Sequence, residues 1–218
     1  MQLTYFNITG YEDRQIPCLL HEPEDALEHL VVMVPGGGYP CDRPLFYYPT
    51  DMFLAKKMRV LHINNDNSRN EEFRAYWDRG EREKINAWRE AEGKSIAAFI
   101  ASKYRCPITL MGMSNGTRIM THILDQAKAV QSIWLSASLN ERWDYLSHNA
   151  DDIVIMGSED SCYERGKPYL PKQTLVIPGG NHSLELGDDV VASLDVLKSI
   201  LLHIAGKILI KDNFTKRS

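Results

Sequence analysis

Gly112-Met113-Ser114-Asn115-Gly116 is the stretch that decides the fold, because the pattern around it changes from strand to helix at one serine. Residues 108–111 form a short apolar run after Pro107, which predicts a buried strand. Residues 117–129 carry apolar side chains at helical spacing, which predicts a helix. A G-x-S-x-G pattern at such a corner is typical of a nucleophile elbow, a sharp turn that exposes the serine hydroxyl at the carboxyl end of a sheet.

The rest of the chain predicts an α/β fold with a mostly parallel central sheet of about eight strands and helices on both faces. Continuous apolar runs indicate strands buried on both sides, and they alternate with helical patterns. The first two strands, joined by a turn at 10–13, predict an antiparallel hairpin. The expected strands are 2–8, 15–21, 30–34, 59–63, 108–111, 132–139, 152–156 and 174–177, and the expected helices are 50–57, 81–103, 117–129 and 188–205. Thr50 is the expected N-cap of its helix, and residues 64–80 are expected to be irregular.

Bulk properties exclude several classes of protein. The 218 residues fit a single domain over 1–218, with 207–218 as a basic, loosely held tail. A net charge of −4 and a pI near 6.0 give no electrostatic case for binding nucleic acid or an anionic membrane. No apolar run approaches a membrane span, and the N-terminus lacks a signal-peptide pattern. The four widely spaced cysteines indicate free thiols and a cytoplasmic location, with disulfide pairing as the alternative.

Two later strands end in residues that can complete the chemistry of a serine nucleophile. A serine hydroxyl needs a base to take its proton, and the base needs a third group to hold its tautomer. In open α/β sheets such groups gather where strands end at their carboxyl edge. Asp160 follows the expected strand 152–156, and His182 follows 174–177. Glu159 is the alternative acid, and ordinary loop or turn roles are the alternative for Asp160 and His182.

The sequence here resembles the α/β-hydrolase family, as a serine esterase-like member without a lid. The matching motifs are Gly112-Met113-Ser114-Asn115-Gly116, Gly157-Ser158-Glu159-Asp160 and Gly179-Gly180-Asn181-His182, and the resemblance covers nearly the whole chain. In that family the nucleophile, acid and base follow this chain order. The resemblance implies that Ser114 is the nucleophile, Asp160 the orienting acid, and His182 the general base and later the general acid.

Acyl transfer also requires hydrogen-bond donors for the oxyanion. The resemblance implies the backbone N–H of Asn115 as one donor and the loop Pro35-Gly36-Gly37-Gly38-Tyr39 as the source of the other. Gly37 and Gly38 are the two candidates, because both lie close to the end of the preceding strand. A glycine-rich turn without a ligand is the alternative. A phosphate-binding loop is less well supported, since no G-K-[ST] follows. The loop resembles the H-G-G-G motif of esterases, with Pro35 in place of histidine, and its P-G-G-G-Y form resembles acetyl-esterase-like branches.

The expected substrate pocket is open, because the interval 140–151 is too short for a cap domain. Trp143 and Tyr145 are candidates for one wall, and Tyr39 is a candidate from the glycine loop, with covering the core edge as its alternative role. The charged and aromatic stretch 64–92 is typical of one solvated helix face. The alternative is that this stretch folds over the site.

These residues predict a serine hydrolase that cleaves a carboxylic ester of a small molecule, with a short acyl group favoured. Thioesterase, amidase or peptidase, and acyltransferase activities use the same three residues, and a ligand-binding protein on a hydrolase scaffold is the non-enzymatic alternative. No metal or organic cofactor is implied. The oligomeric state is open, and a homodimer is compatible with the sequence. Activity is expected to rise as His182 loses its proton near pH 6.5, the approximate pKa of an unperturbed imidazole.

Overall fold

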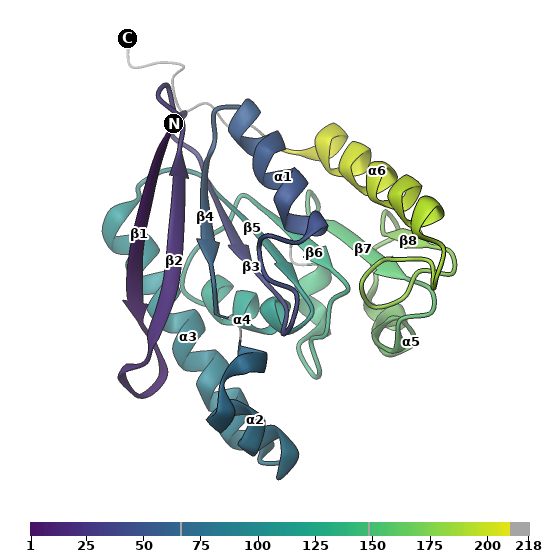
Figure 1. Ribbon diagram of the computed structural model, residues 1–218, viewed down its shortest axis with the longest axis horizontal. Coiled ribbons are helices and arrows are strands. Elements are labelled where there is room, and N and C mark those ends of the chain that lie inside the picture. The colour runs from purple at the N-terminus through teal and green to yellow at the C-terminus, as the bar shows by residue number, and fades with distance from the viewer. Residues whose placement is uncertain (66, 148, 210–218) are drawn as a thin grey trace.

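One mixed β-sheet runs through the centre of the molecule (Figure 1). The computed structural model describes residues 1–65, 67–147 and 149–209. The strands are β1 (Gln2–Thr9), β2 (Gln15–Glu22), β3 (Leu30–Val34), β4 (Arg59–Ile63), β5 (Ile108–Met113), β6 (Gln131–Leu135), β7 (Ile153–Gly157) and β8 (Leu175–Ile177). Their order across the sheet is β1-β2-β4-β3-β5-β6-β7-β8.

Strand direction brings the carboxyl ends of several strands to one edge of the sheet. β1 and β2 form the expected antiparallel hairpin, and β2 pairs antiparallel with β4. From β4 onward every neighbouring pair is parallel. The carboxyl ends of β3, β5, β7 and β8 therefore meet at one edge, which is the lower edge in Figure 1.

Helices cover both faces of the sheet, as predicted. They are α1 (Pro44–Ala55), α2 (Glu71–Asp78), α3 (Arg82–Lys103), α4 (Asn115–Leu124), α5 (Ser161–Gly166) and α6 (Val190–Lys207). In Figure 1, α1 and α6 lie on one face, and α3 and α4 lie on the other. The central strands are buried on both sides because their side chains alternate between two cores: Val32 packs in the cluster that contains residues of α3 and α4, and Val31 in the cluster under α1 and α6.

One predicted helix and one stretch predicted to be irregular differ from the structure. The helix expected at 50–57 begins at Pro44, and proline suits that first position because its fixed φ is already helical. Thr50 is therefore not an N-cap. It lies inside the helix, and its hydroxyl donates to the Phe46 carbonyl at 2.8 Å. Residues 64–80 are also not irregular throughout: they contain a 3₁₀ turn, η2 (Asn67–Arg69), and α2, whose N-cap Asn70 accepts from the Phe73 N–H at 3.0 Å.

Smaller differences concern where elements end. The strand expected at 132–139 stops at Leu135, because Ser136 has a left-handed φ of 42°. The helix expected to reach 129 ends at Leu124. In the expected tail, the N–H of Leu209 donates to the Gln131 side chain at 3.0 Å, and residues 210–218 lie outside the described residues.

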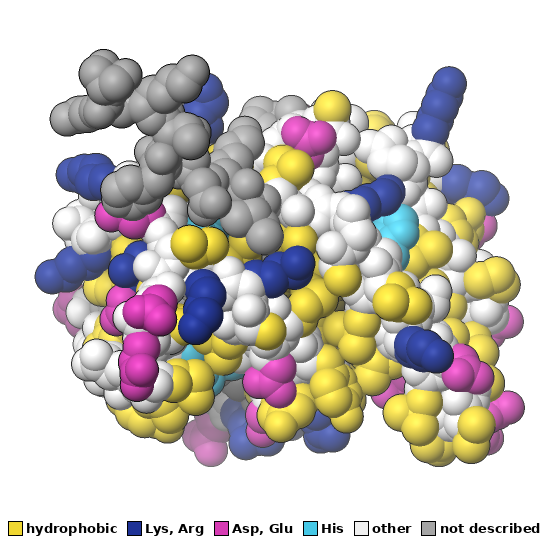
Figure 2. Space-filling view, turned by 90° about the horizontal axis from the view of Figure 1, so that it is seen from above, with side chains coloured by type: hydrophobic (Ala, Val, Ile, Leu, Met, Phe, Trp, Pro, Cys, Tyr) yellow, Lys and Arg dark blue, Asp and Glu magenta, His cyan; other side chains and the backbone are white. Residues whose placement is uncertain are grey.

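The free state of the thiols agrees with the sequence-based prediction. Figure 2, which views the molecule from above, shows acidic and basic side chains interspersed over that face. The four cysteines are free. In the part of the chain that the structure describes, no helix has the length and apolar character needed to cross a bilayer.

Candidate active site

Three side chains from separate strand ends meet at the carboxyl edge of the sheet. Ser114 follows β5, Asp160 follows β7 and His182 follows β8. Since β5 and β7 are separated only by β6, and β8 is next to β7, the sheet order places all three within reach of one another. The sequence places these residues 22 to 68 positions apart, so only the parallel sheet brings them together.

The turn at Ser114 needs glycine on both sides. Ser114 has φ 50° and ψ −119°, a conformation that non-glycine residues rarely adopt. A Cβ on Gly112 would lie 2.2 Å from the Met120 sulfur, and one on Gly116 would lie 2.1 Å from the Val34 carbonyl oxygen. Glycine at these positions lets α4 pack directly against the ends of β3 and β5.

A continuous chain of hydrogen bonds links the three side chains. His182 Nε2 lies 2.7 Å from Ser114 Oγ, and His182 Nδ1 lies 2.8 Å from Asp160 Oδ2. Asp160 is buried, and its other oxygen accepts from the Cys162 N–H at 2.8 Å, where it caps α5. The neighbouring Glu159 is exposed, and its side chain makes no hydrogen bond to the described residues. Asp160 rather than Glu159 therefore contacts the imidazole.

The environment of His182 favours its charged form. The hydrogen bond to Asp160, followed by one to Cys162, raises the pKa of His182 to about 9 despite partial burial. Burial alone would raise the pKa of Asp160, but the hydrogen bonds from His182 and the Cys162 N–H outweigh burial and hold it below its usual value. A carboxylate paired to the far nitrogen strengthens the base that faces Ser114, because an imidazolium formed there is stabilised.

Cys162 is a member of this cluster that the sequence analysis did not identify. Burial would raise the pKa of its thiol, but hydrogen bonds to His182 and Ser138 lower it below its usual value. Asp160, Cys162 and His182 offer three metal-ligand atoms that lie within 4.8 Å of one another. A cation bound by all three would replace the His182–Asp160 hydrogen bond. Its position in the sequence could have identified Cys162, because it follows Asp160 by two residues, in the first turn of α5.

Two residues with unpaired backbone amides line the same cavity as Ser114. The N–H groups of Asn115 and Gly37 donate to no other described residue, and both residues line a cavity of about 390 Å³ together with Ser114. Of the three glycines in this loop, Gly36 approaches Ser114 most closely, since a Cβ there would lie 3.1 Å from Ser114 Cβ. Gly38 has φ 74° and does not line this cavity. Unpaired amides at this position are suited to an oxyanion.

The walls of this cavity differ from the expected pocket. η2 and α2 form one side, with Ser68, Phe73 and Trp77 at the cavity. The interpretation of residues 64–92 as one solvated helix face is therefore wrong for this part, because these residues line the cavity beside Ser114. α2 projects past the strand ends in Figure 1. The alternative, that the stretch folds over the site, stays a prediction.

The three aromatic pocket candidates lie away from this cavity. Trp143 is buried and stacks on Tyr169 with ring centroids 6.4 Å apart. Tyr145 forms a hydrogen-bonded group with Arg142 and Asp125. Tyr39 is half-buried, and its hydroxyl accepts from the Leu45 N–H at 3.3 Å. None of the three lines the cavity beside Ser114.

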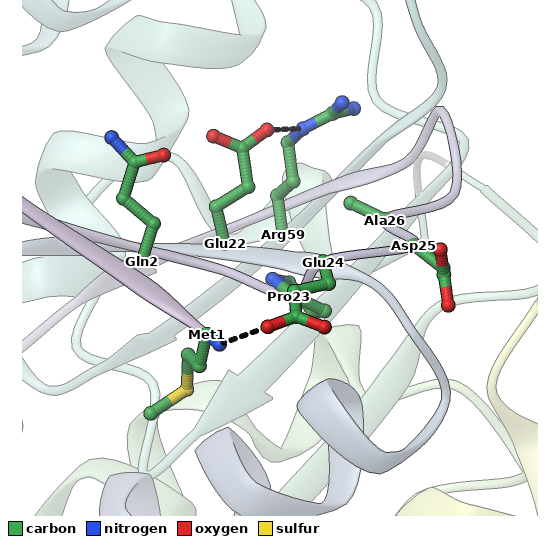
Figure 3. Close-up of a pocket in the computed structure, with 8 residues that line it drawn as sticks. All are labelled: Met1, Gln2, Glu22, Pro23, Glu24, Asp25, Ala26 and Arg59. Carbon is green, nitrogen blue, oxygen red and sulfur yellow. Dashed lines mark hydrogen bonds and ion pairs between the residues drawn. The ribbon is translucent and has the colours of Figure 1, made fainter.

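A second cavity, of about 470 Å³, lies at the opposite edge of the sheet and is shown in Figure 3. It is larger, and two ion pairs lie at it: Arg59 with Glu22 at 2.5 Å, and the Met1 amino group with Glu24 at 3.7 Å. None of Ser114, Asp160 and His182 lines it. The cavity at the serine is therefore the better candidate for chemistry.

Comparison with known proteins rests on structure. No protein-family model matches the sequence, and no curated protein matches it. A cold-adapted esterase from an Arctic intertidal metagenomic library has 15% identity and a TM-score of 0.66, over 95% of this chain and 94% of the esterase. A lidless α/β serine hydrolase from Xanthomonas campestris has 11% identity and a TM-score of 0.65, over 97% of each chain. A dienelactone hydrolase from Anabaena variabilis has 13% identity and a TM-score of 0.61, over 95% of this chain and 99% of that enzyme.

The sheet order, the antiparallel hairpin and these similarities show that the chain has the α/β-hydrolase fold.

Proposed function

We propose that this chain is a serine hydrolase that cleaves a carboxylic ester. The observation that carries the proposal is the continuous chain from Ser114 Oγ through His182 to Asp160, at 2.7 and 2.8 Å, beside two unpaired amides. An esterase and a lidless serine hydrolase among the structural neighbours support it at the level of fold.

The proposed reaction has two halves. Ser114 Oγ attacks the ester carbonyl while its proton passes to His182 Nε2, and the N–H groups of Asn115 and Gly37 donate to the oxyanion. The tetrahedral intermediate collapses, the C–O bond breaks, and His182 returns the proton to the departing alcohol. Water then attacks the acyl-enzyme with His182 again accepting a proton, which releases the carboxylic acid and free Ser114.

The central test is covalent labelling by a fluorophosphonate. Wild type is expected to be labelled, and Ser114→Ala is expected to resist labelling and to lose activity on the order of 10⁶-fold. Ser102→Ala, an exposed serine near the end of α3, is the matched control and is expected to label normally. If wild type resists labelling as completely as Ser114→Ala, the chain is a binding protein on a hydrolase scaffold.

Substrate class is tested separately, because thioesterases, amidases and acyltransferases share the proposed triad. The measurement is kcat/KM for 4-nitrophenyl esters from acetyl to long acyl groups, beside matched thioesters and anilides. We infer a preference for short acyl groups from the P-G-G-G-Y loop. A higher kcat/KM for the thioester or anilide series would reassign the reaction while leaving Ser114 as nucleophile.

A further inference from the structure

The cavity beside Ser114 is lined by three arginine side chains, from three different helices. Arg74 comes from α2, Arg89 from α3 and Arg118 from α4. One carboxylate, Asp78, also lines the cavity, and it is exposed. None of the three arginines forms an ion pair with a described carboxylate. The cavity therefore has an excess of positive charge.

Only 3% of the surface of Arg89 is exposed, and its hydrogen-bond partners are neutral. Its Nε–H donates to the Asn115 side-chain oxygen at 2.6 Å, and Nη1 donates to Asn86 at 3.3 Å. Burial, and next the charge of Arg118, lower the pKa of Arg89 to about 9. Burying a cation among neutral partners is unfavourable unless an anion joins it.

Arg118 in α4 has the same kind of surroundings and lines the same cavity. Its Nε donates to the Ser138 carbonyl, and Nη2 donates to the Ser138 hydroxyl at 2.9 Å and to Asn140 at 2.7 Å. Burial lowers its pKa as well. The guanidinium is fixed by these bonds, so it cannot move away from Arg89 without breaking them.

The nearest buried acid does not neutralise this pair. Glu92 lies one turn along α3 from Arg89, but its oxygens accept from Asn65, Asn67 and Trp88 at 2.8 to 3.1 Å. No ion pair joins it to Arg89, although its charge acts on Arg89 at longer range. Glu92 is therefore engaged by other donors and leaves the cavity side of Arg89 open.

Two guanidinium nitrogens remain available. Among the described residues, Arg89 Nη2 and Arg118 Nη1 have no hydrogen-bond partner, and neither is sealed in the interior. Each can donate to one oxygen, which matches the two oxygens of a carboxylate. Phe73 and Trp77 supply an apolar wall for the rest of a small molecule.

We propose that this cavity binds the carboxylate of an anionic ester, held between Arg89 and Arg118 while Ser114 attacks the ester carbonyl. The reaction in this statement rests on the proposed hydrolase function, whereas the binding of a carboxylate does not. A substrate of this class is a half-ester of a short dicarboxylic acid, or an ester whose alcohol part carries a carboxylate.

Matched ester pairs test the preference. Monomethyl glutarate against methyl pentanoate places the charge on the acyl side, and 4-acetoxybenzoate against 4-tolyl acetate places it on the alcohol side. Hydrolysis is followed by pH-stat, and kcat/KM is compared within each pair. At least one anionic member is expected to exceed its neutral match by on the order of 10- to 100-fold, the range for hydrogen bonds to a charged group.

Variants identify the residues responsible. Arg118→Gln is expected to remove most of that preference, and Arg118→Lys is expected to retain part of it. Arg89→Gln is expected to lower the same ratio and also the activity on neutral esters, because it releases Asn115. Arg82→Gln, an exposed arginine at the start of α3, is the matched control and is expected to keep the ratio. Equal kcat/KM within both pairs, or an unchanged ratio in Arg118→Gln, overturns the proposal.

A binding measurement separates this proposal from the hydrolase proposal. Glutarate is titrated calorimetrically into Ser114→Ala and into the Ser114→Ala/Arg118→Gln double variant. Binding to the first with at least tenfold weaker binding to the second supports the carboxylate site even if no ester is cleaved. Fluorophosphonate labelling of wild type without glutarate binding leaves the hydrolase proposal standing and overturns this one.

Discussion

The fold raises the pKa of His182 well above that of a free imidazole. Its Nδ1–H donates to Asp160 at 2.8 Å, and this bond, with that to Cys162, raises its pKa to about 9. In the proposed reaction the general base works only when neutral, so activity is expected to follow the fraction of deprotonated His182. The sequence alone suggested a midpoint of about 6.5, the value of an unperturbed imidazole. The difference arises because the sequence predicted the contact with Asp160 but neither its effect on the pKa of His182 nor the contribution of Cys162.

The pH dependence of kcat/KM for a neutral ester therefore has an expected midpoint well above 6.5, near 9. In Asp160→Asn the midpoint is expected to fall toward 6.5, because the hydrogen bond to Asp160 is the largest cause of the raised pKa of His182. The value of kcat is expected to drop on the order of 10⁴-fold. NMR titration of the imidazole in Ser114→Ala gives the same pKa without turnover. A wild-type midpoint at or below 6.5 would contradict the assignment of His182 and Asp160.

The sequence predicted some residues of the candidate site and missed others. The contact among Ser114, Asp160 and His182 was predictable because each follows a recognisable strand end in a short motif. Arg89 carried no such signal: it lies on α3, 25 positions before Ser114, and only tertiary packing brings it to Asn115. Arg118 is one helical turn after Ser114, so its presence at the site could be predicted from the sequence, although its lack of an acidic partner among the described residues could not.

At the level of elements, the contact between the elbow helix α4 and strand β3 holds the serine turn in place. Gly116 in α4 sits against the backbone of β3, where a Cβ would lie 2.1 Å from the Val34 oxygen and 2.5 Å from the Pro35 oxygen. Backbone atoms cannot move aside as a side chain can, so the helix itself must shift. The strained φ of Ser114 depends on that packing.

Gly116→Ala and Gly206→Ala therefore make a matched pair with opposite expected signs. Gly116→Ala is expected to lower the free energy of unfolding by about 1 to 3 kcal/mol through overpacking, and to impair labelling of Ser114. Gly206 lies in α6, and a Cβ there would have no atom within 4 Å, so alanine is expected to be neutral or stabilising by up to about 1 kcal/mol. Urea unfolding measures both. Equal effects of the two substitutions would show that the α4–β3 contact does not constrain the elbow.

Elements differed in how well their sequence predicted them. Strands β3, β4 and β5 are continuous apolar runs, and burial on both faces makes such runs distinctive. α2 is polar over most of its length, because it packs on α3 along only a narrow face that contains Phe73 and Tyr76. A helix with so few buried side chains leaves little apolar periodicity to detect. In α6, Val190 and Leu194 fit the amphipathic pattern but are exposed, since the core contacts come from Ile200 and Ile204.

For the molecule as a whole, two histidines give stability opposite dependences on pH. His62 is buried, with Nε2 2.8 Å from Thr50 Oγ1 on α1 and its ring 4.5 Å from that of His21 on β2. Burial, and next the charge of His21, lower the pKa of His62 to about 3. Because the unfolded chain binds a proton near pH 6.5 and the folded one does not, stability is lost as pH falls from 6.5 toward 3. His182 has a raised pKa, so its contribution is complete below 6.5 and is lost as pH rises toward 9.

Stability is therefore expected to be greatest near pH 6.5 and to fall on both sides. On the acid side, His62 alone gives the free energy of unfolding a slope of up to about 1.4 kcal/mol per pH unit, the value for the binding of one proton. His62→Gln removes this titration while an amide can still donate to Thr50, so the acid slope is expected to flatten and the alkaline slope to stay unchanged. His182→Gln is the reciprocal control, expected to flatten only the alkaline side. Urea unfolding from pH 4.5 to 9 measures all three proteins. If His62→Gln and wild type lose stability in parallel below pH 6.5, other groups control the acid side, because a buried neutral His62 must contribute to that slope.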